Sequence, residues 1–320
     1  MTDNDTTMFG KEKNPSNILP VKYTLDSKIK FRCHPGVSCF TACCGNIGIV
    51  LTPFDILRLR KHIGISSDEF LLRFTRPDWM EKTDLPGVKI NLDENGRCPF
   101  VTDKGCTIYE HRPSACRYYP IGMANFHSGG KEDVESERFF FVVKEKHCKG
   151  HEEDKEWTIR EWRADQGVDL CDEMNREWME LVMRRKSFGH QATLAPEAQQ
   201  VFFMASTNLE KFKDFIFNSN FLNTYEIDDE TLKEIQEDDI KLMFFGFKYL
   251  RSSIFGTKDL TIKQEKIDAK VEEIKQKQKE KETSIVETYE ELKDDRDKLA
   301  AMLDEVKQSK AYGGKGLKKK

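Results

Sequence analysis

The chain has 320 residues, a formal net charge of −4 and 34% charged residues, and its hydrophobic content is 38%. This length allows two domains, or one domain with an appendage. The slight excess of acidic residues gives no general electrostatic reason to expect nucleic-acid binding. No run of about 18 apolar residues occurs in the sequence, so no membrane span is expected.

Residues 1–20 are polar and show no apolar periodicity, so we expect a disordered lead. They contain no positively charged stretch followed by an apolar segment, so no secretory signal is expected and the predicted location is the cytoplasm. Thiols stay reduced in that compartment. Clustered cysteines in such a protein indicate metal binding or catalysis rather than disulfide bonds.

Eight of the nine cysteines fall between residues 33 and 148. We predict that these eight ligate metal: Cys33, Cys39, Cys43, Cys44, Cys98, Cys106, Cys116 and Cys148. The alternative is a set of reduced core cysteines, since free cysteine is often buried. Chance burial does not explain a vicinal pair together with two short cysteine spacings, and disulfides would require an export route.

The identity of the metal stays open. Zinc takes four ligands per ion, so eight cysteines could supply two ions, although the usual pair of C-x-x-C knuckles is absent. Iron–sulfur clusters also take thiolates and tolerate irregular spacing. The adjacent Cys43 and Cys44 could serve two metals, or one of them could ligate while the other packs.

Other residues near the cysteines are candidates for supporting roles. Arg32, Arg112 and Arg117 either offset the negative charge of thiolates or are ordinary surface arginines. Five histidines could supply nitrogen ligands, with a structural role as the alternative for each, and His147 is the most suggestive because it precedes Cys148. These histidines are His34, His111, His127, His147 and His151.

The cysteine-rich region, residues 21–150, mixes helix and strand signals. Thr52 and Pro53 begin a helix that should end at Gly64, and Ser66 begins a second one through Phe74. We also expect a short helix begun by Pro113, with Cys116 at its end. Strands are predicted at residues 88–92 and 138–143, the second after a mobile loop at residues 128–130.

Residues 151–256 are predicted to be helical and to pack on the cysteine-rich domain. A helical pair is expected over residues 157–188, where Thr158 caps the first helix, Gly167 ends it and Asp169 caps the second. Cys171 lies in the second helix and is predicted to be a buried thiol. Residues 194–256 continue with helical periodicity in Phe, Leu and Ile.

Residues 257–310 are dominated by Lys and Glu and predict a long charged helix, followed by a flexible basic tail at residues 311–320. Apolar residues recur at alternating steps of four and three, which predicts a coiled coil that binds a protein partner or self-associates through residues 260–306. The alternative is a single solvated helix held by Glu/Lys pairs. The apolar seam residues are Ile267, Val271, Ile274, Ile285, Leu292, Leu299, Met302 and Val306, and the remaining seam positions are weak links: Gln278, Lys281, Thr288 and Asp295. The whole pattern predicts an α+β fold: a small cysteine-rich metal-binding domain, a helical cover and a long charged C-terminal helix.

The cysteines and their flanking residues resemble a known family. The opening run ends in Cys43-Cys44, and three further segments follow: Cys98-Pro-Phe, Gly105-Cys-Thr-Ile-Tyr-Glu110 and Arg112-Pro-Ser-Ala-Cys-Arg-Tyr-Tyr-Pro120. Over residues 31–150 this pattern resembles the YkgJ-type family of zinc- or iron-chelating cysteine-cluster proteins, and later segments resemble its longer bacterial members. The family opens with C-x-x-C-x-x-C-C, whereas the gaps here are five and three residues.

The same cysteine cluster occurs in flagellin lysine N-methylases, so the resemblance also implies methyl transfer as an alternative. The sequence contains no strand followed by a Gly-rich loop for S-adenosylmethionine and no C-x-x-x-C-x-x-C radical motif. Three functions stay open: a cytoplasmic metalloprotein with zinc or an iron–sulfur cluster, a cluster-dependent enzyme, and a zinc-folded scaffold that acts through its coiled coil. No catalytic residue is assigned.

Overall fold

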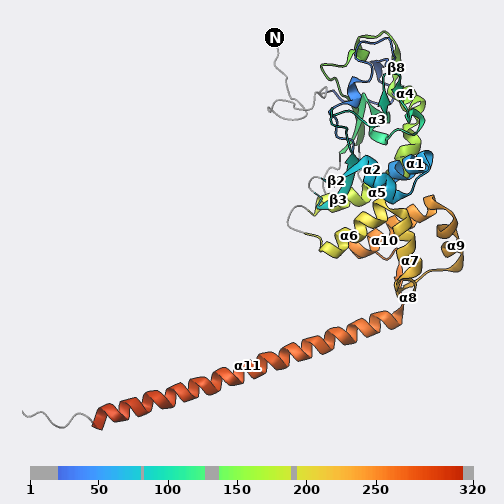
Figure 1. Cartoon of the computed structure of the whole chain (residues 1–320). Coiled ribbons are helices and arrows are strands. Elements are labelled where there is room, and N and C mark those ends of the chain that lie inside the picture. Colours follow the sequence, from blue (N-terminus) through green and yellow to red (C-terminus); the bar gives the residue numbers. More distant parts are fainter. Residues whose placement is uncertain (1–20, 81–82, 127–136, 189–192, 313–320) are drawn as a thin grey trace, which may run out of the picture. The chain divides into compact units, whose positions relative to one another are not determined.

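The computed structural model describes residues 21–80, 83–126, 137–188 and 193–312 (Figure 1). The sequence predictions for residues 1–20, the loop at 128–130, His127 and residues 313–320 fall outside this description. The fold mixes helices and strands, which confirms the α+β class. The chain divides into two compact units, the first formed by residues up to Leu222 together with Ile227–Leu260, the second by Asn223–Glu226 and the residues from Thr261 onward.

The cysteine-rich half of the first unit contains two α-helices that both start where the sequence predicts. Helix α1 spans Pro53–Ile63: the Thr52 hydroxyl accepts from the Asp55 amide and the Asp55 carboxylate accepts from the Thr52 amide, both at 3.1 Å. It ends at Gly64, whose φ of 79° favours glycine. Helix α2 spans Ser67–Phe74, and the Ser66 hydroxyl accepts from the Glu69 amide.

A hairpin follows α2. Strand β2 (Thr75–Met80) pairs antiparallel with β3 (Leu85–Ile90). The predicted strand at residues 88–92 therefore starts three residues earlier and ends two residues sooner. The first half of β3 contains Pro86 and Gly87, which interrupt the alternation of apolar residues that predicts a strand. In the hairpin Pro86 nevertheless pairs with Trp79, and Gly87 pairs with Asp78.

One hydrophobic core forms around this hairpin, and we call it the β3 core. It comprises Ile49, Leu51, Ile56, Leu59, Phe70, Val88, Ile90, Phe100 and Ile108. Three cysteines that are partly buried pack against it: Cys98, Cys106 and Cys116.

A second core lies in the same unit, and we call it the β7 core. Its strands are β1 (Lys28–Lys30), which pairs with β8 (Glu156–Thr158), and β6 (Ile121–Phe126), which pairs with β7 (Glu137–Val142). The core residues are Ile29, Phe31, Ile121, Phe140, Val142, Ile159 and Trp162. Cys148 packs against this core rather than the first one.

Short elements and the loops beside them carry the clustered cysteines. The short elements are the 3-10 helices η1 (Ala42–Cys44), η2 (Tyr109–His111) and η3 (Lys149–Glu152), the strands β4 (Val101–Thr102) and β5 (Gly105–Cys106), and helix α3 (Ser114–Tyr118). Cys116 lies in the middle of α3, not at its end as predicted.

The helical pair predicted at residues 157–188 needs two corrections. Trp157 and Thr158 belong to β8, because Trp157 pairs with Ile29 and its indole donates to the Phe31 carbonyl. Thr158 then caps α4 (Ile159–Asp165) as expected. Asp169 does not cap α5 (Val168–Ser187); Gly167 takes that position with φ 62°, and Asp169 accepts from Arg163 instead.

The remaining helices of the first unit are α6 (Pro196–Thr207), α7 (Leu209–Asn218), α8 (Phe221–Thr224, whose last two residues fall in the second unit), α9 (Asp229–Glu237) and α10 (Asp239–Phe255). Helix α6 packs on β3 and α10 packs on both α5 and α6, so the helical cover lies against the cysteine-rich half. Cys171 on α5 is 1% exposed, which confirms the predicted buried thiol.

The second unit is built around the long C-terminal helix. Strand β9 (Tyr225–Glu226) pairs with β10 (Thr261–Ile262), and the Thr224 carbonyl accepts from the Lys263 amide just before α11 begins. Helix α11 spans Gln264–Tyr312, 49 residues, so the long charged helix is confirmed. It extends through residues 311 and 312, which were predicted to belong to the flexible tail.

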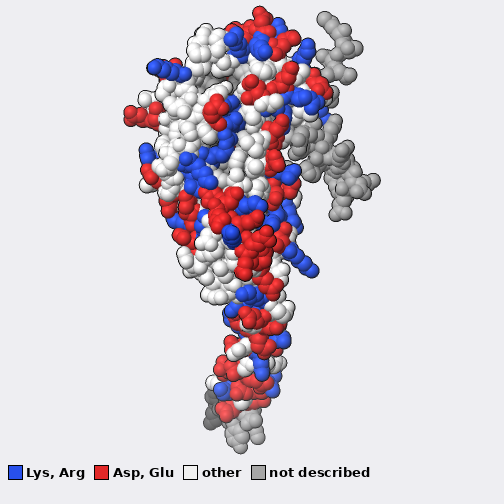
Figure 2. All heavy atoms as spheres, turned by 90° about the vertical axis from the view of Figure 1, so that its right-hand side faces the viewer, with Lys and Arg blue, Asp and Glu red and all other residues white. Residues whose placement is uncertain are grey.

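Within the described residues, none of the helices is both long enough and apolar enough to cross a membrane. Basic and acidic side chains are interspersed over the face seen in Figure 2.

Arg60 on α1 links three helices of the first unit. It is 8% exposed, and its guanidinium contacts Asp239 on α10 at 2.7 Å and Glu210 on α7 at 2.9 Å. Burial alone would raise the pKa of Asp239, but the hydrogen bond from Lys61 and the charges of Arg60, Lys61 and Lys213 outweigh burial and lower it.

We predict that Asp239→Asn lowers the free energy of unfolding by about 2 kcal/mol at pH 7, because it removes a charged partner from a buried guanidinium. The pKa of the Asp239 carboxyl is lower in the folded state than in the unfolded state. The difference in unfolding free energy between wild type and variant is therefore complete above the unfolded-state pKa of about 3.9, and it vanishes as pH falls through the folded-state pKa. Urea unfolding at several pH values measures it. Glu237→Gln, an exposed carboxylate, is the control and should change little.

Candidate metal centre

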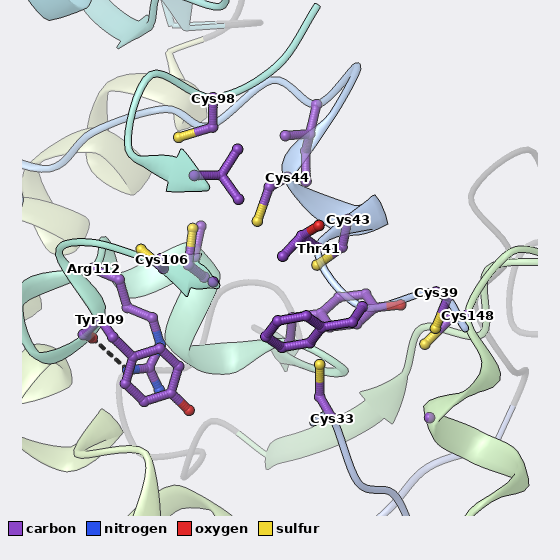
Figure 3. Close-up of a pocket in the computed structure, with 18 of the residues that line it drawn as sticks. Cys33, Cys39, Thr41, Cys43, Cys44, Cys98, Cys106, Tyr109, Arg112 and Cys148 are labelled. Atoms are coloured by element: carbon purple, nitrogen blue, oxygen red, sulfur yellow. Dashed lines mark hydrogen bonds between the residues drawn. The ribbon is translucent and has the colours of Figure 1, made fainter. Parts of the chain in front are cut away.

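All eight cysteines predicted as ligands line one cavity in the first unit (Figure 3). Its volume is about 420 Å³. The thiols come from segments more than 100 residues apart in sequence, and all of them are free. Cys171 is not part of the cavity wall. The fold therefore gathers the predicted ligands and leaves out the cysteine that was predicted to be structural.

Backbone hydrogen bonds bring the segment around Cys44 to the segment around Cys98. The Cys98 amide donates to the Cys44 carbonyl at 2.8 Å, and the Asn46 amide donates to the Gly96 carbonyl at 2.7 Å. Beyond Cys98 the chain turns into β4 and β5, where Val101 pairs with Cys106. These contacts fix Cys44, Cys98 and Cys106 on one wall of the cavity.

A second set of contacts brings the start of the chain to the segment around Cys148. The Arg32 amide donates to the Gly150 carbonyl at 3.0 Å, and the Lys149 amide donates to the Cys39 thiol sulfur at 3.1 Å. Gly150 allows this approach: a Cβ at that position would lie 2.7 Å from the Phe31 ring and 2.9 Å from the Arg32 carbonyl oxygen. Sequence reasoning missed Gly150, although it follows Cys148 by only two residues.

The cavity environment disfavours most of the thiolates. Burial, together with the charges of Cys43, Cys39 and Cys148, raises the pKa of Cys33 to about 11. Burial and the charges of Cys98, Asp55, Cys106 and Cys43 raise the pKa of Cys116 to about 12. Burial also raises the pKa of the Cys98, Cys106 and Cys148 thiols. Deprotonating several of these thiols together therefore requires a cation among them.

The vicinal pair behaves differently. A hydrogen bond from the Cys44 thiol lowers the pKa of Cys43 to about 7, and the same bond raises the pKa of Cys44. Among the cavity thiols whose pKa is shifted, Cys43 is therefore the one that ionises most readily near neutral pH.

Arg112 and Arg117 are each 7% exposed, so the surface alternative is wrong for both; Arg112 lines the cavity, whereas Arg117 is not part of the cavity wall. Arg112 donates to the Tyr109 carbonyl at 2.6 Å and to the Gln166 side chain. Arg117 donates to the carbonyls of Arg112, Gln166 and Glu110. Among the described residues, neither guanidinium has a carboxylate within ion-pair distance, so anionic ligands in the cavity would offset the charge of Arg112, which also acts on Cys106. Arg32 is exposed.

Of the candidate histidines, His147 lines the cavity and contacts the Glu145 carboxylate at 3.4 Å. The other three that the structure describes have partners elsewhere. His34 contacts Glu153 at 3.1 Å, His111 stacks on His62, and His151 bonds to the Val143 carbonyl at 3.1 Å. Sequence reasoning also missed Tyr119, which lines the cavity and whose hydroxyl donates to the Glu145 carboxylate at 3.2 Å; its position in the Arg112–Pro120 motif was the available signal.

The chemistry of this donor set fits thiolate-ligated zinc or an iron–sulfur cluster, since both take cysteine sulfur. In the described part of the chain, no three His, Cys, Asp or Glu side chains are already arranged to hold a metal ion. The thiols surround a common space, and ligation would turn them inward from the cavity wall.

A cavity walled by free thiols is an arrangement that sulfur ligation of a metal requires. Residues 32–149 match the model of the CxxCxxCC family, described as "Putative zinc- or iron-chelating domain". All eight predicted ligands lie inside the matched segment. Comparison with curated proteins and with solved structures found no significant match.

We predict that Cys43 is the first cavity thiol to be alkylated in reduced, metal-free protein at pH 7.5, because the thiolate is the reactive form. Its rate should fall several-fold at pH 6, as protonation removes the thiolate of a group with pKa about 7. Timed iodoacetamide labelling with peptide mass spectrometry measures each site. Cys171, buried in α5, is the internal control and should stay unlabelled; equal labelling of Cys116 and Cys43 would contradict the prediction.

Proposed function

We propose that the protein binds metal through its eight-cysteine cavity, holding zinc or an iron–sulfur cluster by sulfur ligation. The observation that carries this proposal is that eight thiols from distant segments line one cavity. The two metals share the same ligand chemistry, because both are bound by cysteine thiolates. We propose a cytoplasmic location, where such thiols stay reduced.

The charges around the cavity support this proposal. Four thiolates on a metal dication leave a net negative charge. The buried guanidinium of Arg112, which lines the cavity, would lie beside that charge and would be poorly compensated without it. Metal binding would therefore stabilise the thiolates of the crowded cysteines and place a negative charge beside the buried guanidinium.

Metal would also stabilise the fold. The ligand segments follow β1, surround β4 and β5, and precede η3, so a centre in the cavity would cross-link parts of the chain that are connected mainly by short elements. Because metal binding then contributes to folding free energy, a chelator should destabilise the protein. We take residues 21–150 as the metal-binding domain and residues 151–256 as the helical region that packs on it.

We predict that protein purified without oxygen contains metal. Brown protein with acid-labile sulfide and absorption near about 400 nm would identify an iron–sulfur cluster. Colourless protein with zinc by elemental analysis would identify zinc. Protein that is folded, reduced and free of both metals, and that takes up neither, would overturn the proposed function.

Single substitutions extend this experiment to the ligands. Cys44→Ser, Cys106→Ser and Cys116→Ser should each lower the metal content per chain, because each removes a thiol of the cavity. Cys171→Ser is the matched control, since it also removes a thiol but lies outside the cavity, and it should retain the wild-type metal content.

We propose in addition that α11 pairs with α11 of a second copy of the chain. The described seam residues are 39–64% exposed although they are apolar: Ile267, Val271, Ile274, Ile285, Leu292, Leu299 and Met302. They repeat every seven residues over much of the helix, and a partner with the same repeat would cover them.

The charges beside the seam favour a parallel pair. In that arrangement Lys277 of one helix would face Glu282 of the other, and Glu291 would face Arg296. Lys270 and Lys275 would bring like charges together near the start of the helix, and the seam residues Lys281 and Asp295 would each face the same residue of the second copy. A second copy therefore matches both the period and most of the flanking charges.

We predict that Ile285→Lys shifts the protein from dimer to monomer, because it places a charge in the seam. Val286→Lys is a closely matched control, since Val286 is adjacent, equally exposed at 59%, and off the seam. Light scattering during size-exclusion chromatography measures the mass of each variant. Wild-type protein that is monomeric at high concentration, or dissociation by both variants alike, would contradict the pairing.

A further inference from the structure

The cavity lies between two separate hydrophobic cores. Cys98, Cys106 and Cys116 pack against the β3 core, and Cys148 packs against the β7 core. The thiols are therefore held by two different parts of the cysteine-rich half.

Hydrogen bonds attach three of the other cysteines to one side or the other. Cys44 joins the β3 side, because its carbonyl accepts from the Cys98 amide at 2.8 Å. Cys39 joins the β7 side, because its sulfur accepts from the Lys149 amide, next to Cys148. Cys33 joins the same side, since it follows Arg32, whose amide donates to the Gly150 carbonyl.

The vicinal pair marks the boundary between the two sides. Cys43 and Cys44 end the 3-10 helix η1, where consecutive side chains are rotated by about 120° around the helix axis. Figure 3 shows both sulfurs facing the cavity, with the Cys44 sulfur on the side of Cys98 and Cys106 and the Cys43 sulfur between it and Cys33. Neighbouring residues thus supply thiols to different sides.

We propose that the cavity holds two separate sulfur-ligated centres, each with four cysteines of its own. The β3 group is Cys44, Cys98, Cys106 and Cys116; the β7 group is Cys33, Cys39, Cys43 and Cys148. This partition rests on the proposed metal-binding function and deepens it. Four thiolates complete the coordination of one zinc ion or one iron–sulfur cluster, so neither group needs a ligand from the other.

The electrostatic interactions among the thiols run within the two groups and also across them, since Cys43 acts most strongly on Cys44. Within the β7 group, the cysteine charges that act on Cys33 are those of Cys43, Cys39 and Cys148. Within the β3 group, Cys116 is affected by Cys98 and Cys106. Cys43 also acts on Cys106 and Cys116, as expected for a residue at the boundary.

The test measures metal stoichiometry by native mass spectrometry after metal-free protein is loaded with zinc alone. Wild-type protein should bind two zinc ions per chain. The double variants Cys33→Ser/Cys148→Ser and Cys98→Ser/Cys106→Ser should each bind one, a twofold loss, whereas Cys171→Ser should still bind two. Cobalt loading of each double variant should retain sulfur-to-metal charge-transfer absorption at about half the wild-type intensity.

Gly150→Ala provides a variant that keeps every thiol. A Cβ at residue 150 would push against Phe31 and Arg32 and move Cys33 away from Cys148. It should weaken zinc binding at the β7 group alone, so one zinc ion per chain stays tightly bound. Loss of both ions to the same extent would overturn the partition.

The outcomes separate the two proposals. Wild-type protein that binds a single zinc ion, with both double variants binding none, would overturn the two-centre arrangement while leaving metal binding intact. Wild-type protein that binds no zinc, together with the absence of an iron–sulfur cluster in oxygen-free protein, would overturn the proposed function itself.

Discussion

The crowding of partly buried thiols is the constraint on which the cysteine-rich half depends. Eight thiols line one cavity, and burial together with mutual repulsion raises the pKa of most of them. Two guanidiniums are buried in the same half, Arg112 in the cavity wall and Arg117 bonded to the Arg112 carbonyl, and both donate to carbonyl oxygens. A metal cation would balance the thiolates, and the arginines would balance the remaining negative charge. The short strands and 3-10 helices around the cavity place the donors, whereas the cores beside it hold those elements in position.

The sequence predicted the helix starts well because their signals are local. Thr52, Ser66 and Thr158 each cap a helix through a residue three positions later, so each pattern is complete within four residues. Local signals failed where a partner strand decides the structure. Trp157 belongs to β8 because Ile29 pairs with it from more than 120 residues away, and Pro86 lies in β3 because Trp79 faces it. No periodicity within either segment contains that information.

The candidate site shows the same contrast between local signals and long-range contacts. Residue type and flanking motifs identified the eight cysteines, because soft-metal chemistry depends on sulfur itself. Their division between two cores could not be predicted, since it depends on long-range contacts such as the Arg32 amide with the Gly150 carbonyl. The buried state of Arg112 and Arg117 was equally hidden, because the enclosing partner Gln166 lies about 50 residues further along the chain. Cys171 was separable from the ligands because it lies alone in an amphipathic helix.

The two buried arginines have a consequence for electron transfer. Guanidinium groups keep their charge throughout the physiological pH range, so the positive potential they impose on the cavity is permanent. Net charge and hydrogen bonding near an iron–sulfur cluster set its reduction potential. A cluster bound beside Arg112 would accept an electron more readily than the same cluster in an uncharged cavity, and the chain would favour its reduced form without any change of ligand.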